Sequence, residues 1–472
     1  MGIHFGTDGW RAIIGDEFTF ANVRRVAQAV ADWIGDSDGN SARAMIIGYD
    51  TRFLSDRFAA EFAQVLAGNG ITVYLPDSPT PTPVISFAVK QLGAAGGVMV
   101  TASHNPAAYN GIKLKDATGG SASKADCARV EEYLERNRPV RSIDMAVAEQ
   151  RGLVQRYDPM PAYEAHLETL VSREVLASHP SSVVVDPMHG AGRDHIRRWL
   201  EPAGWTVAQI RGEPNPSFGG VSPEPILANL HPLRSAVLER GYALGLATDG
   251  DADRTGAIDG TGRFVDPHCI FSLVLRYLVE KRGWRGTVVK SVSVTRMVDR
   301  LCARYQLPVV ETPVGFGHIS DLMLVDDFLM GGEESGGISI QGHVPVGDGI
   351  LLGLLLAEIA ADARATLAEL VDDLQRSVGP AHYARHDLRI ARPINKRSMS
   401  ERLAGDAPKS IGGVVVDLVQ QNDGVKYLLV NGGWLLIRPS GTEPVLRVYA
   451  EAPEPAALAA LLAYGQSIAA QV

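Results

Sequence analysis

The chain has 472 residues, which at roughly 100–200 residues per domain predicts several domains rather than one. Hydrophobic residues make up 46% of the chain and charged residues 21%, which matches globular proteins and excludes wholesale disorder. The net charge is −9, and there is no long basic run, so we expect no nucleic-acid partner. No apolar stretch approaches the roughly 20 residues that span a bilayer, so we expect no membrane partner either.

The chain has three cysteines, Cys127, Cys269 and Cys302, which are too far apart in the sequence to form a C-x-x-C motif. This spacing excludes a disulfide framework and a structural zinc site of the usual kind. The sequence from Met1 lacks a charged segment followed by an apolar stretch, so it does not resemble a secretion signal. We therefore expect a cytoplasmic protein.

The first 150 residues alternate apolar runs with amphipathic stretches. The runs Ala44–Gly48, Ile71–Leu75 and Gly97–Val100 have the character of buried strands, and apolar residues between 58 and 66 recur at helical spacing. This alternation predicts an α/β sheet that binds its ligand at the ends of the strands.

The same alternation returns at Val183–Asp186 and at Gly286–Lys290, which is followed by a helix expected from Thr295. The run Gly349–Ala357 is too short to span a membrane and predicts a buried helix. After residue 380 the pattern changes to four strand-like runs and a closing helix: Val414–Asp417, Tyr427–Val430, Trp434–Ile437, Val445–Tyr449 and the helix from Pro455. We therefore predict three tandem α/β domains, 1–150, 151–254 and 255–376, and a C-terminal α+β domain, 377–472.

The first segment that can carry chemistry is Thr101-Ala-Ser-His-Asn-Pro106, directly after an apolar strand. Ser103 is then expected in an exposed turn, with His104 beside it and Lys113 ten residues further on. These residues can supply a nucleophilic or phosphorylated oxygen together with positive charge or proton transfer. An ordinary turn, in which Ser103 only bonds to the backbone, remains an equal alternative at this point.

The second segment is Asp249-Gly-Asp-Ala-Asp-Arg254, which also follows an apolar run. Asp249, Asp251 and Asp253 repel one another in a short loop unless a cation compensates their charge, so we predict a metal site. An EF-hand is excluded because Gly is required at the sixth position and Glu at the twelfth, where this chain has Arg254 and Gly260. Oxygen-only ligands favour Mg²⁺ over zinc.

Two further loops have the composition of binding sites. The segment Met330-Gly-Gly-Glu-Glu-Ser-Gly-Gly337 presents Glu333 and Ser335 among four glycines, as suits a ligand rich in hydroxyl groups, although a plain glycine-rich turn is equally compatible. The segment Arg438-Pro-Ser-Gly-Thr-Glu-Pro444 lies between two predicted strands, with Arg447 on the second. Turn N–H groups, two hydroxyls and two guanidinium groups favour a phosphate clamp over a simple hairpin turn.

These four segments, in this order, together with Phe5-Gly-Thr-Asp-Gly-Trp-Arg11, resemble the α-D-phosphohexomutase superfamily of phosphoglucomutases and phosphomannomutases. The resemblance spans nearly the whole chain. It implies three mixed α/β domains and a C-terminal α+β domain around a central active-site cleft.

The resemblance also implies an intramolecular phosphotransferase that interconverts hexose 1-phosphate and hexose 6-phosphate. The phosphoryl group is carried on Ser103, and a hexose 1,6-bisphosphate serves as intermediate and activator. Glucose is the first choice of sugar and mannose the second. The resemblance implies that the catalytic residues are Arg11, Ser103, His104 and Lys113, with Lys113 favoured for proton transfer. It implies that Asp249, Asp251 and Asp253 hold Mg²⁺ together with Ser103. The residues implied to bind the sugar phosphate are Arg254, Glu333, Ser335, Arg438, Ser440, Gly441, Thr442 and Arg447.

The sequence departs from the family in one segment. Many relatives have a Gly-aromatic-Lys sequence that contributes to substrate selection, whereas Val314-Gly-Phe-Gly-His318 has Gly317 in place of that lysine. We hypothesise that His318 substitutes for it. The choice of hexose and the oligomeric state, monomer or homodimer, are therefore left open.

Three alternative functions remain. A phosphoglucosamine mutase differs from the first choice only in the sugar. A haloacid-dehalogenase-like phosphatase would use Asp251 of the D-x-D-x-T pattern that ends at Thr255 as nucleophile, but it leaves the segments around Ser103 and Arg438 without a role. A non-catalytic sugar-phosphate sensor would be expected to lack Ser103 or one of the aspartates, and all of them are present.

Overall fold

The computed structural model describes residues 3–6, 9–36, 44–325, 327–390, 395–439 and 445–470. The chain divides into two compact units. The first contains residues 1–270 and 315–369, and the second contains residues 271–314 and 370–472. Two helices, α10 (Pro267–Glu280) and α14 (Leu367–Val378), carry the chain from the first unit into the second. Each unit is described by itself.

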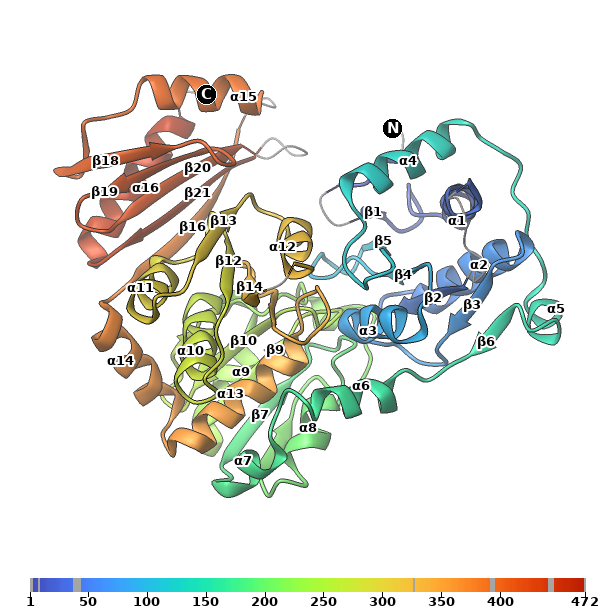
Figure 1. Cartoon of the computed structure of the whole chain (residues 1–472), viewed down its shortest axis with the longest axis horizontal. Coiled ribbons are helices and arrows are strands. Elements are labelled where there is room, and N and C mark those ends of the chain that lie inside the picture. Colours follow the sequence, from blue (N-terminus) through green and yellow to red (C-terminus); the bar gives the residue numbers. More distant parts are fainter. Residues whose placement is uncertain are drawn as a thin grey trace. The chain divides into compact units, whose positions relative to one another are not determined.

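The first unit opens with a six-stranded mixed sheet in the order β1-β5-β4-β2-β3-β6. Strands β2, β3, β4 and β6 run parallel, while β5 pairs antiparallel with both β4 and β1. Helices α1 and α2 pack with each other against one face, and α3 packs against β2 and β4 from a separate apolar cluster (Figure 1). The elements are β1 (Trp10–Ile13), α1 (Phe20–Asp36), β2 (Ala44–Tyr49), α2 (Ser55–Gly68), β3 (Thr72–Leu75), α3 (Thr82–Leu92), β4 (Gly96–Val100), β5 (Tyr109–Lys115), α4 (Lys124–Glu135), α5 (Met145–Gln150) and β6 (Val154–Arg156).

A five-stranded sheet follows, in the order β11-β10-β9-β7-β8. Its central strand β9 is parallel to β7 and antiparallel to β10, so the loop between β9 and β10 is a tight connection in the middle of the sheet. That loop is the acidic segment after residue 248. The elements are α6 (Met160–Leu167), α7 (Arg173–Ser178), β7 (Ser182–Asp186), α8 (His195–Leu200), β8 (Thr206–Gln209), η1 (Phe218–Gly220), η2 (Leu227–Asn229), α9 (His231–Arg240), β9 (Leu244–Thr248), β10 (Thr255–Asp259) and β11 (Phe264–Val265).

The first unit is completed by α12 (Phe316–Met323), β14 (Phe328–Gly332), β15 (Ile338–Ile340) and α13 (Gly349–Ala363). Strands β14 and β15 form an antiparallel hairpin around the glycine-rich segment. Asp348 caps α13 by accepting hydrogen bonds from the backbone N–H groups of Ile350 and Leu351, both at 2.9 Å. Nearly all of α13 is buried, which confirms the buried helix predicted from residue 349.

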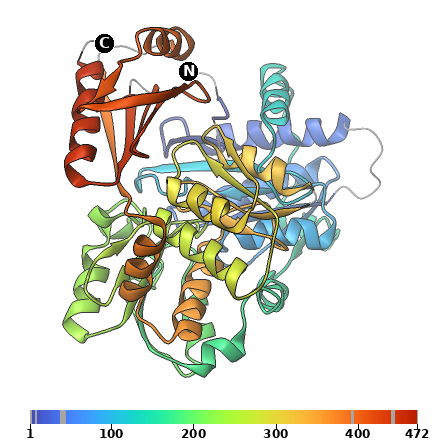
Figure 2. The ribbon, with the colours of Figure 1, turned by 60° about the vertical axis from the view of Figure 1, so that its left-hand side comes forward.

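The second unit contains an α/β part and a C-terminal sheet. Strands β12 (Thr287–Ser291) and β13 (Val309–Thr312) pair in parallel, and the chain between them forms α11 (Arg296–Tyr305), whose N-cap is Thr295. The C-terminal sheet is antiparallel, in the order β16-β21-β20-β19-β18-β17, and α16 packs along it (Figure 2). Its elements are β16 (His382–Arg389), α15 (Lys396–Gly405), β17 (Ser410–Ile411), β18 (Val414–Gln420), β19 (Val425–Leu429), β20 (Trp434–Pro439), β21 (Val445–Ala452) and α16 (Pro455–Ala469).

The predicted fold class is confirmed: mixed α/β sheets come first and an antiparallel α+β sheet closes the chain. Two strands lie just beyond the domain boundaries predicted from the sequence. Strand β6 follows residue 150 and pairs with β3 of the first sheet, and β10 follows residue 254 and pairs with β9 of the second. Among the described residues, every helix is too short or too polar to cross a membrane.

Candidate active site

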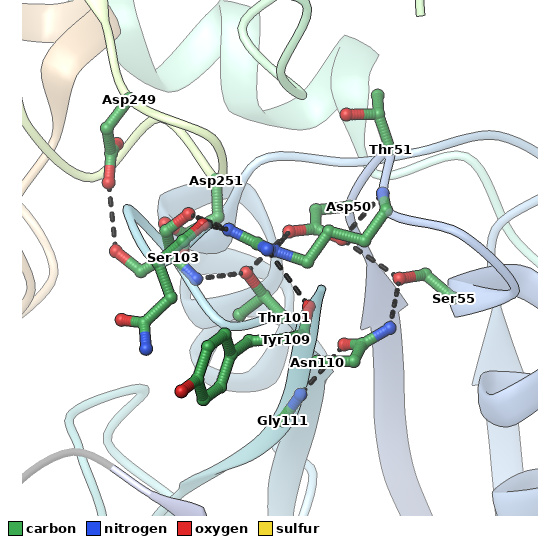
Figure 3. Close-up of polar contacts among 12 residues, drawn as sticks. Asp50, Thr51, Ser55, Thr101, Ser103, Tyr109, Asn110, Gly111, Asp249 and Asp251 are labelled. Carbon is green, nitrogen blue, oxygen red and sulfur yellow. Dashed lines mark hydrogen bonds and ion pairs between the residues drawn. The ribbon is translucent and has the colours of Figure 1, made fainter. Parts of the chain in front are cut away.

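Ser103 lies in the loop that leaves the central strand β4 of the first sheet. Its hydroxyl donates a hydrogen bond to Oδ2 of Asp249 at 2.9 Å, and its backbone N–H donates to Oγ1 of Thr101 at 2.8 Å (Figure 3). Its φ of +52° is a left-handed conformation that residues other than glycine rarely adopt. Such strain persists only where surrounding contacts enforce it, and it is common at functional sites. The position at the strand end was predicted, whereas the burial of Ser103 corrects the exposed turn expected from the sequence.

The acidic loop lies directly against the serine loop. One carboxylate oxygen each from Asp249, Asp251 and Asp253 lies within 4.8 Å of the others. A Cβ atom on Gly250 would come within 2.5 Å of the carbonyl oxygen of Ser103, so only glycine allows the two loops to approach this closely. The sequence prediction that the three carboxylates converge is therefore reproduced in the geometry.

The electrostatics of this cluster fit a cation. Burial, followed by repulsion from Asp253 and Asp251, raises the pKa of Asp249 well above its usual value. Burial also acts to raise the pKa of Asp251, but the Lys113 ammonium and the Thr82 hydroxyl outweigh it and lower that pKa. Oδ1 of Asp251 is buried and has no hydrogen-bond partner within the described chain. A hard divalent ion would offset the repulsion between the clustered carboxylates and would bind the buried oxygen that has no hydrogen-bond partner.

Lys113 and Arg11 reach the site from neighbouring antiparallel strands. Nζ of Lys113 on β5 lies 2.9 Å from Oδ2 of Asp251 and 2.7 Å from Oδ2 of Asp253, so it shares partners with any bound metal ion. Nη1 of Arg11 on β1 donates to Oδ1 of Asn105 in the serine loop at 2.9 Å. Both basic residues therefore lie around the loop that carries Ser103.

His104 is neutral at neutral pH. Burial, and then the positive charges of Arg254 and Arg11, lower the pKa of its imidazole well below the usual value. Its Nδ1 atom is buried and has no hydrogen-bond partner among the described residues. The ring next to Ser103 is therefore uncharged, and the same burial and positive charges make it a weak base.

The glycine-rich loop between β14 and β15 packs against the acidic loop and the strand that follows it. A Cβ atom on Gly336 of this loop would lie 2.8 Å from the carbonyl oxygen of Thr255, and one on Gly347, after β15, would lie 2.5 Å from that of Asp253. Oε1 of Glu333 accepts a hydrogen bond of 2.7 Å from the backbone N–H of Gly315, at the start of α12. Ser335, in the same loop, is half-buried. This loop, the serine loop and the acidic loop therefore meet within the first unit.

Arg254 and the segment around Gly317 border the same region. The guanidinium of Arg254 lies 3.8 Å from Asp253 and 3.9 Å from Glu224. A Cβ atom on Gly317 would meet nothing within 4 Å, so open space lies where the family lysine was expected. Nζ of Lys124, at the start of α4, lies 3.5 Å from Nε2 of His318.

Comparison with known protein families agrees with this geometry. Four models of phosphoglucomutase/phosphomannomutase match in chain order: α/β/α domain I over residues 2–141, domain II over 161–262, domain III over 266–377 and the C-terminal domain over 393–464. A phosphoglucomutase/phosphomannomutase of Thermococcus kodakarensis is 30% identical over 96% of this chain and 95% of its own. The chain belongs to this family.

Other relatives in the family carry different names. A phosphoglucosamine mutase of Mycolicibacterium gilvum is 30% identical over 95% of both chains. The crystal structure of a Thermus thermophilus protein assigned as a phosphomannomutase is 34% identical, covers 99% of both chains and superposes with a TM-score of 0.86. The family consists of intramolecular phosphotransferases that act on hexose phosphates, and the names of these relatives differ in the sugar.

The residues assigned to phosphate binding in the C-terminal sheet belong to the second unit. Arg438 on β20 is directly opposite Arg447 on β21. Nε of Arg438 lies 2.7 Å from Oδ2 of Asp423, and Nε of Arg447 lies 3.8 Å from Oδ2 of Asp387. The two arginines therefore lie opposite each other on neighbouring strands, and each guanidinium group has its own aspartate partner. Ser440, Gly441 and Thr442 lie outside the described residues.

Sequence reasoning missed the buried residues that contact the serine loop and the acidic loop. Asp50 and Arg52 are fully buried next to the serine loop, and Thr82 donates to Oδ2 of Asp251 at 2.6 Å. A signal was available: Asp50-Thr-Arg52 directly follows β2, which is the parallel neighbour of β4 in the sheet. Because parallel strands end at the same edge, charged residues there were candidates for the site that contains Ser103.

Proposed function

We propose that the protein interconverts hexose 1-phosphate and hexose 6-phosphate through a phosphorylated Ser103. The observation that carries the proposal is the 2.9 Å hydrogen bond from the Ser103 hydroxyl to Asp249, one of the three clustered carboxylates. A phosphoryl group on that oxygen would lie next to the basic side chains of Lys113 and Arg11. These groups suit the stabilisation of charge on a transferring phosphoryl group.

The proposed reaction has two balanced steps. In the first, the bond between phosphorus and Ser103 Oγ breaks as a bond forms to the free hydroxyl of the sugar phosphate. Lys113 enters this step as the neutral amine, having first released its proton to solvent, and it accepts the proton of that hydroxyl. Neutral His104 is the second candidate acceptor, and a hexose 1,6-bisphosphate results. In the second step the other phosphoryl group moves to Ser103 Oγ, the proton returns to the sugar oxygen and the isomeric monophosphate is released.

The carboxylates of Asp249, Asp251 and Asp253 are the residues that would hold Mg²⁺, with an oxygen on Ser103 as a further ligand. Mg²⁺ would supply charge compensation for the transferring phosphoryl group. Arg254, Glu333 and Ser335 are proposed to bind the sugar, and Arg438, Ser440, Gly441, Thr442 and Arg447 to bind the phosphate that is not transferred.

Glucose and mannose phosphates are the preferred substrates in this proposal. Phosphoglucosamine is the alternative, supported by relatives that carry that name. The contact between Lys124 and His318 favours the first choice. Gly315, which bonds to Glu333, is the N-cap of α12, and the first turn of α12 places His318 beside Lys124 of α4. A cationic neighbourhood is less favourable for the ammonium group of glucosamine than for a hydroxyl.

A coupled assay tests both the reaction and the sugar. The 1-phosphates of glucose, mannose and glucosamine are compared in the presence of Mg²⁺ and a trace of the matching 1,6-bisphosphate, and kcat/KM ranks them. We expect glucose 1-phosphate to rank first and Lys124→Ala to raise the relative value for glucosamine 1-phosphate. Lys90→Ala, at an exposed lysine of α3, is the control. Turnover of none of the three sugars would refute the mutase.

The carrier is tested separately. Ser103→Ala should lower kcat by at least about 10³-fold, because it removes the group that forms the covalent intermediate. Peptide mapping of the purified enzyme, before and after hydroxylamine, distinguishes the mutase from the Asp251 phosphatase, since phosphoserine resists hydroxylamine and an aspartyl phosphate does not. A hydroxylamine-labile phosphate on Asp251 would assign the chain to the phosphatase class instead.

A further inference from the structure

Arg52 is a fully buried arginine whose five N–H donors are all engaged. Its Nε donates to Oδ2 of Asp50 at 3.1 Å. The other four donors meet backbone carbonyl oxygens of one loop, at 2.5 Å for Ser103, 2.7 Å for Asn105, 2.9 Å for Pro106 and 3.0 Å for Tyr109. Since a guanidinium group has five donors in a fixed planar fork, this one group sets the path of the whole serine loop.

Asp50 holds the same loop through its other contacts. Oδ2 of Asp50 accepts a hydrogen bond of 2.6 Å from the hydroxyl of Thr101, which in turn accepts the backbone N–H of Ser103 (Figure 3). Oδ1 of Asp50 accepts from the hydroxyl of Ser55 at 2.9 Å. Ser103 is therefore held on both sides: its carbonyl oxygen by Arg52 and its N–H by Thr101 and Asp50. These contacts are what enforces the left-handed φ of Ser103.

The segment that carries Arg52 also contacts loops of the second sheet. The hydroxyl of Thr51 donates to the carbonyl oxygen of His189 at 2.8 Å, and the Arg52 guanidinium lies 4.9 Å from the centre of the Phe218 ring. Two residues after His189, the N–H of Ala191 donates to the carbonyl oxygen of Gly250 at 2.9 Å. A continuous set of contacts thus runs from Arg52 to the acidic loop that receives the Ser103 hydroxyl.

We propose that Arg52 is a positioning residue for phosphoryl transfer, which fixes the Ser103 oxygen relative to the acidic loop without touching the substrate. This inference rests on the function proposed above. A displacement of about 1 Å in a reacting group can cost roughly 100-fold in rate, and Arg52 controls the backbone on which that oxygen is carried. Because the clamp acts on the carrier and not on the bound sugar, its loss should appear in kcat and leave KM nearly unchanged.

Arg52→Lys is the direct test. It keeps the charge beside Asp50 but replaces the planar fork by a compact ammonium that cannot reach four carbonyl groups in the same way. We expect kcat to fall by about 100-fold and KM to stay within about threefold. Thr101→Val and Thr101→Ser form a second pair: Val removes the acceptor for the Ser103 N–H and should lower kcat, and Ser should restore it.

Arg211→Lys is the matched control, because Arg211 forms a similar ion pair with the buried Asp186 at the end of β7. It should reduce thermal stability to a similar extent and leave kcat unchanged. A kcat for Arg52→Lys within threefold of wild type, or a rise in KM at unchanged kcat, would overturn the proposal. An equal fall in kcat for Arg211→Lys would also overturn it, because the effect would then be general loss of packing.

Hydrogen exchange keeps this test separate from that of the proposed function. Amide protection of the segment 101–111 is compared in wild type, Arg52→Lys and Arg211→Lys. Arg52→Lys alone should lose protection there. If wild type turned over no hexose phosphate, the mutase would be wrong, while the exchange result would still decide whether Arg52 holds the loop.

Discussion

At the scale of single residues, the site is organised by unbalanced negative charge. Asp249 and Asp251 are both buried; Lys113 is paired with Asp251 and Asp253, and Arg254 lies 3.8 Å from Asp253. Two basic groups do not balance three carboxylates, and one oxygen of Asp251 is left without a partner among the described residues. A bound divalent cation resolves both problems at once.

Metal removal should therefore abolish turnover. Treatment with EDTA is expected to stop catalysis, and excess Mg²⁺ should restore it, because the carboxylates repel one another when the ion is absent. Asp251→Asn should weaken the apparent affinity for Mg²⁺ by at least about tenfold, since affinity follows the number of charged ligands. Titration of activity against Mg²⁺ measures this. Asp194→Asn, at the N-cap of α8, is the control, and activity that survived exhaustive chelation would contradict the three-carboxylate site.

At the scale of secondary-structure elements, apolar strands were predictable and polar ones were not. The run at 97–100 was found because continuous burial requires continuous apolar sequence. Strand β5 was missed since its buried residues include the polar Asn110, Lys113 and Lys115, of which Lys113 pairs with Asp251 and Asp253. Strand β16 was missed since it is an edge strand of alternating charged and half-buried residues, and only its pairing with β21 defines it.

The candidate site divides in the same way. Ser103 and the three aspartates could be predicted because local spacing alone places them in loops after apolar strands. Arg52 was missed although it follows β2 at the same sheet edge, because its role depends on complete burial and on four carbonyl groups more than 50 residues away in the chain. Bonds to backbone carbonyl groups require no particular side chain in the partner segment, so they leave no pattern in its sequence.

Helix α8 gives a pH-dependent prediction. Burial lowers the pKa of His195 from 6.5 to about 4, and its Nδ1 atom has no partner among the described residues. Below pH 6.5 the unfolded chain takes up a proton that the folded chain refuses until about pH 4, so the free energy of unfolding falls as the pH drops through this window. From pH 7.5 to 5 the contribution is about 2 kcal/mol.

His195→Gln should remove this contribution. Chemical denaturation at pH 7.5 and pH 5 should show a loss of stability in wild type that exceeds the loss in the variant by about 2 kcal/mol. His231→Gln, at an exposed imidazole of α9, should behave as wild type. Equal losses in wild type and His195→Gln would show that His195 does not resist protonation in the folded state.

At the scale of the whole molecule, the family matches extend over all four domain models, and relatives align over 95% or more of this chain. The reacting loops belong to the first unit, and Arg438 and Arg447 belong to the second. In a mutase that returns one phosphoryl group from a bisphosphate to a single carrier serine, each half of the cycle leaves one phosphate group that is not transferred. The enzyme must bind that phosphate group in both halves. Binding that is the same before and during chemistry affects KM more than kcat.

Arg438→Ala should accordingly raise KM much more than it lowers kcat. The expected loss is on the order of 1.5–3 kcal/mol, the value of a charge-assisted hydrogen bond to phosphate. Because 1-phosphates and 6-phosphates would use the same guanidinium groups in turn, forward and reverse assays should show similar losses, as the fixed equilibrium constant also requires of kcat/KM. Arg397→Ala, which removes an exposed arginine paired with Glu401 on α15, should change neither constant. A collapse of kcat at unchanged KM would instead assign Arg438 to the transferring phosphoryl group, since only interactions gained in the transition state act on kcat alone.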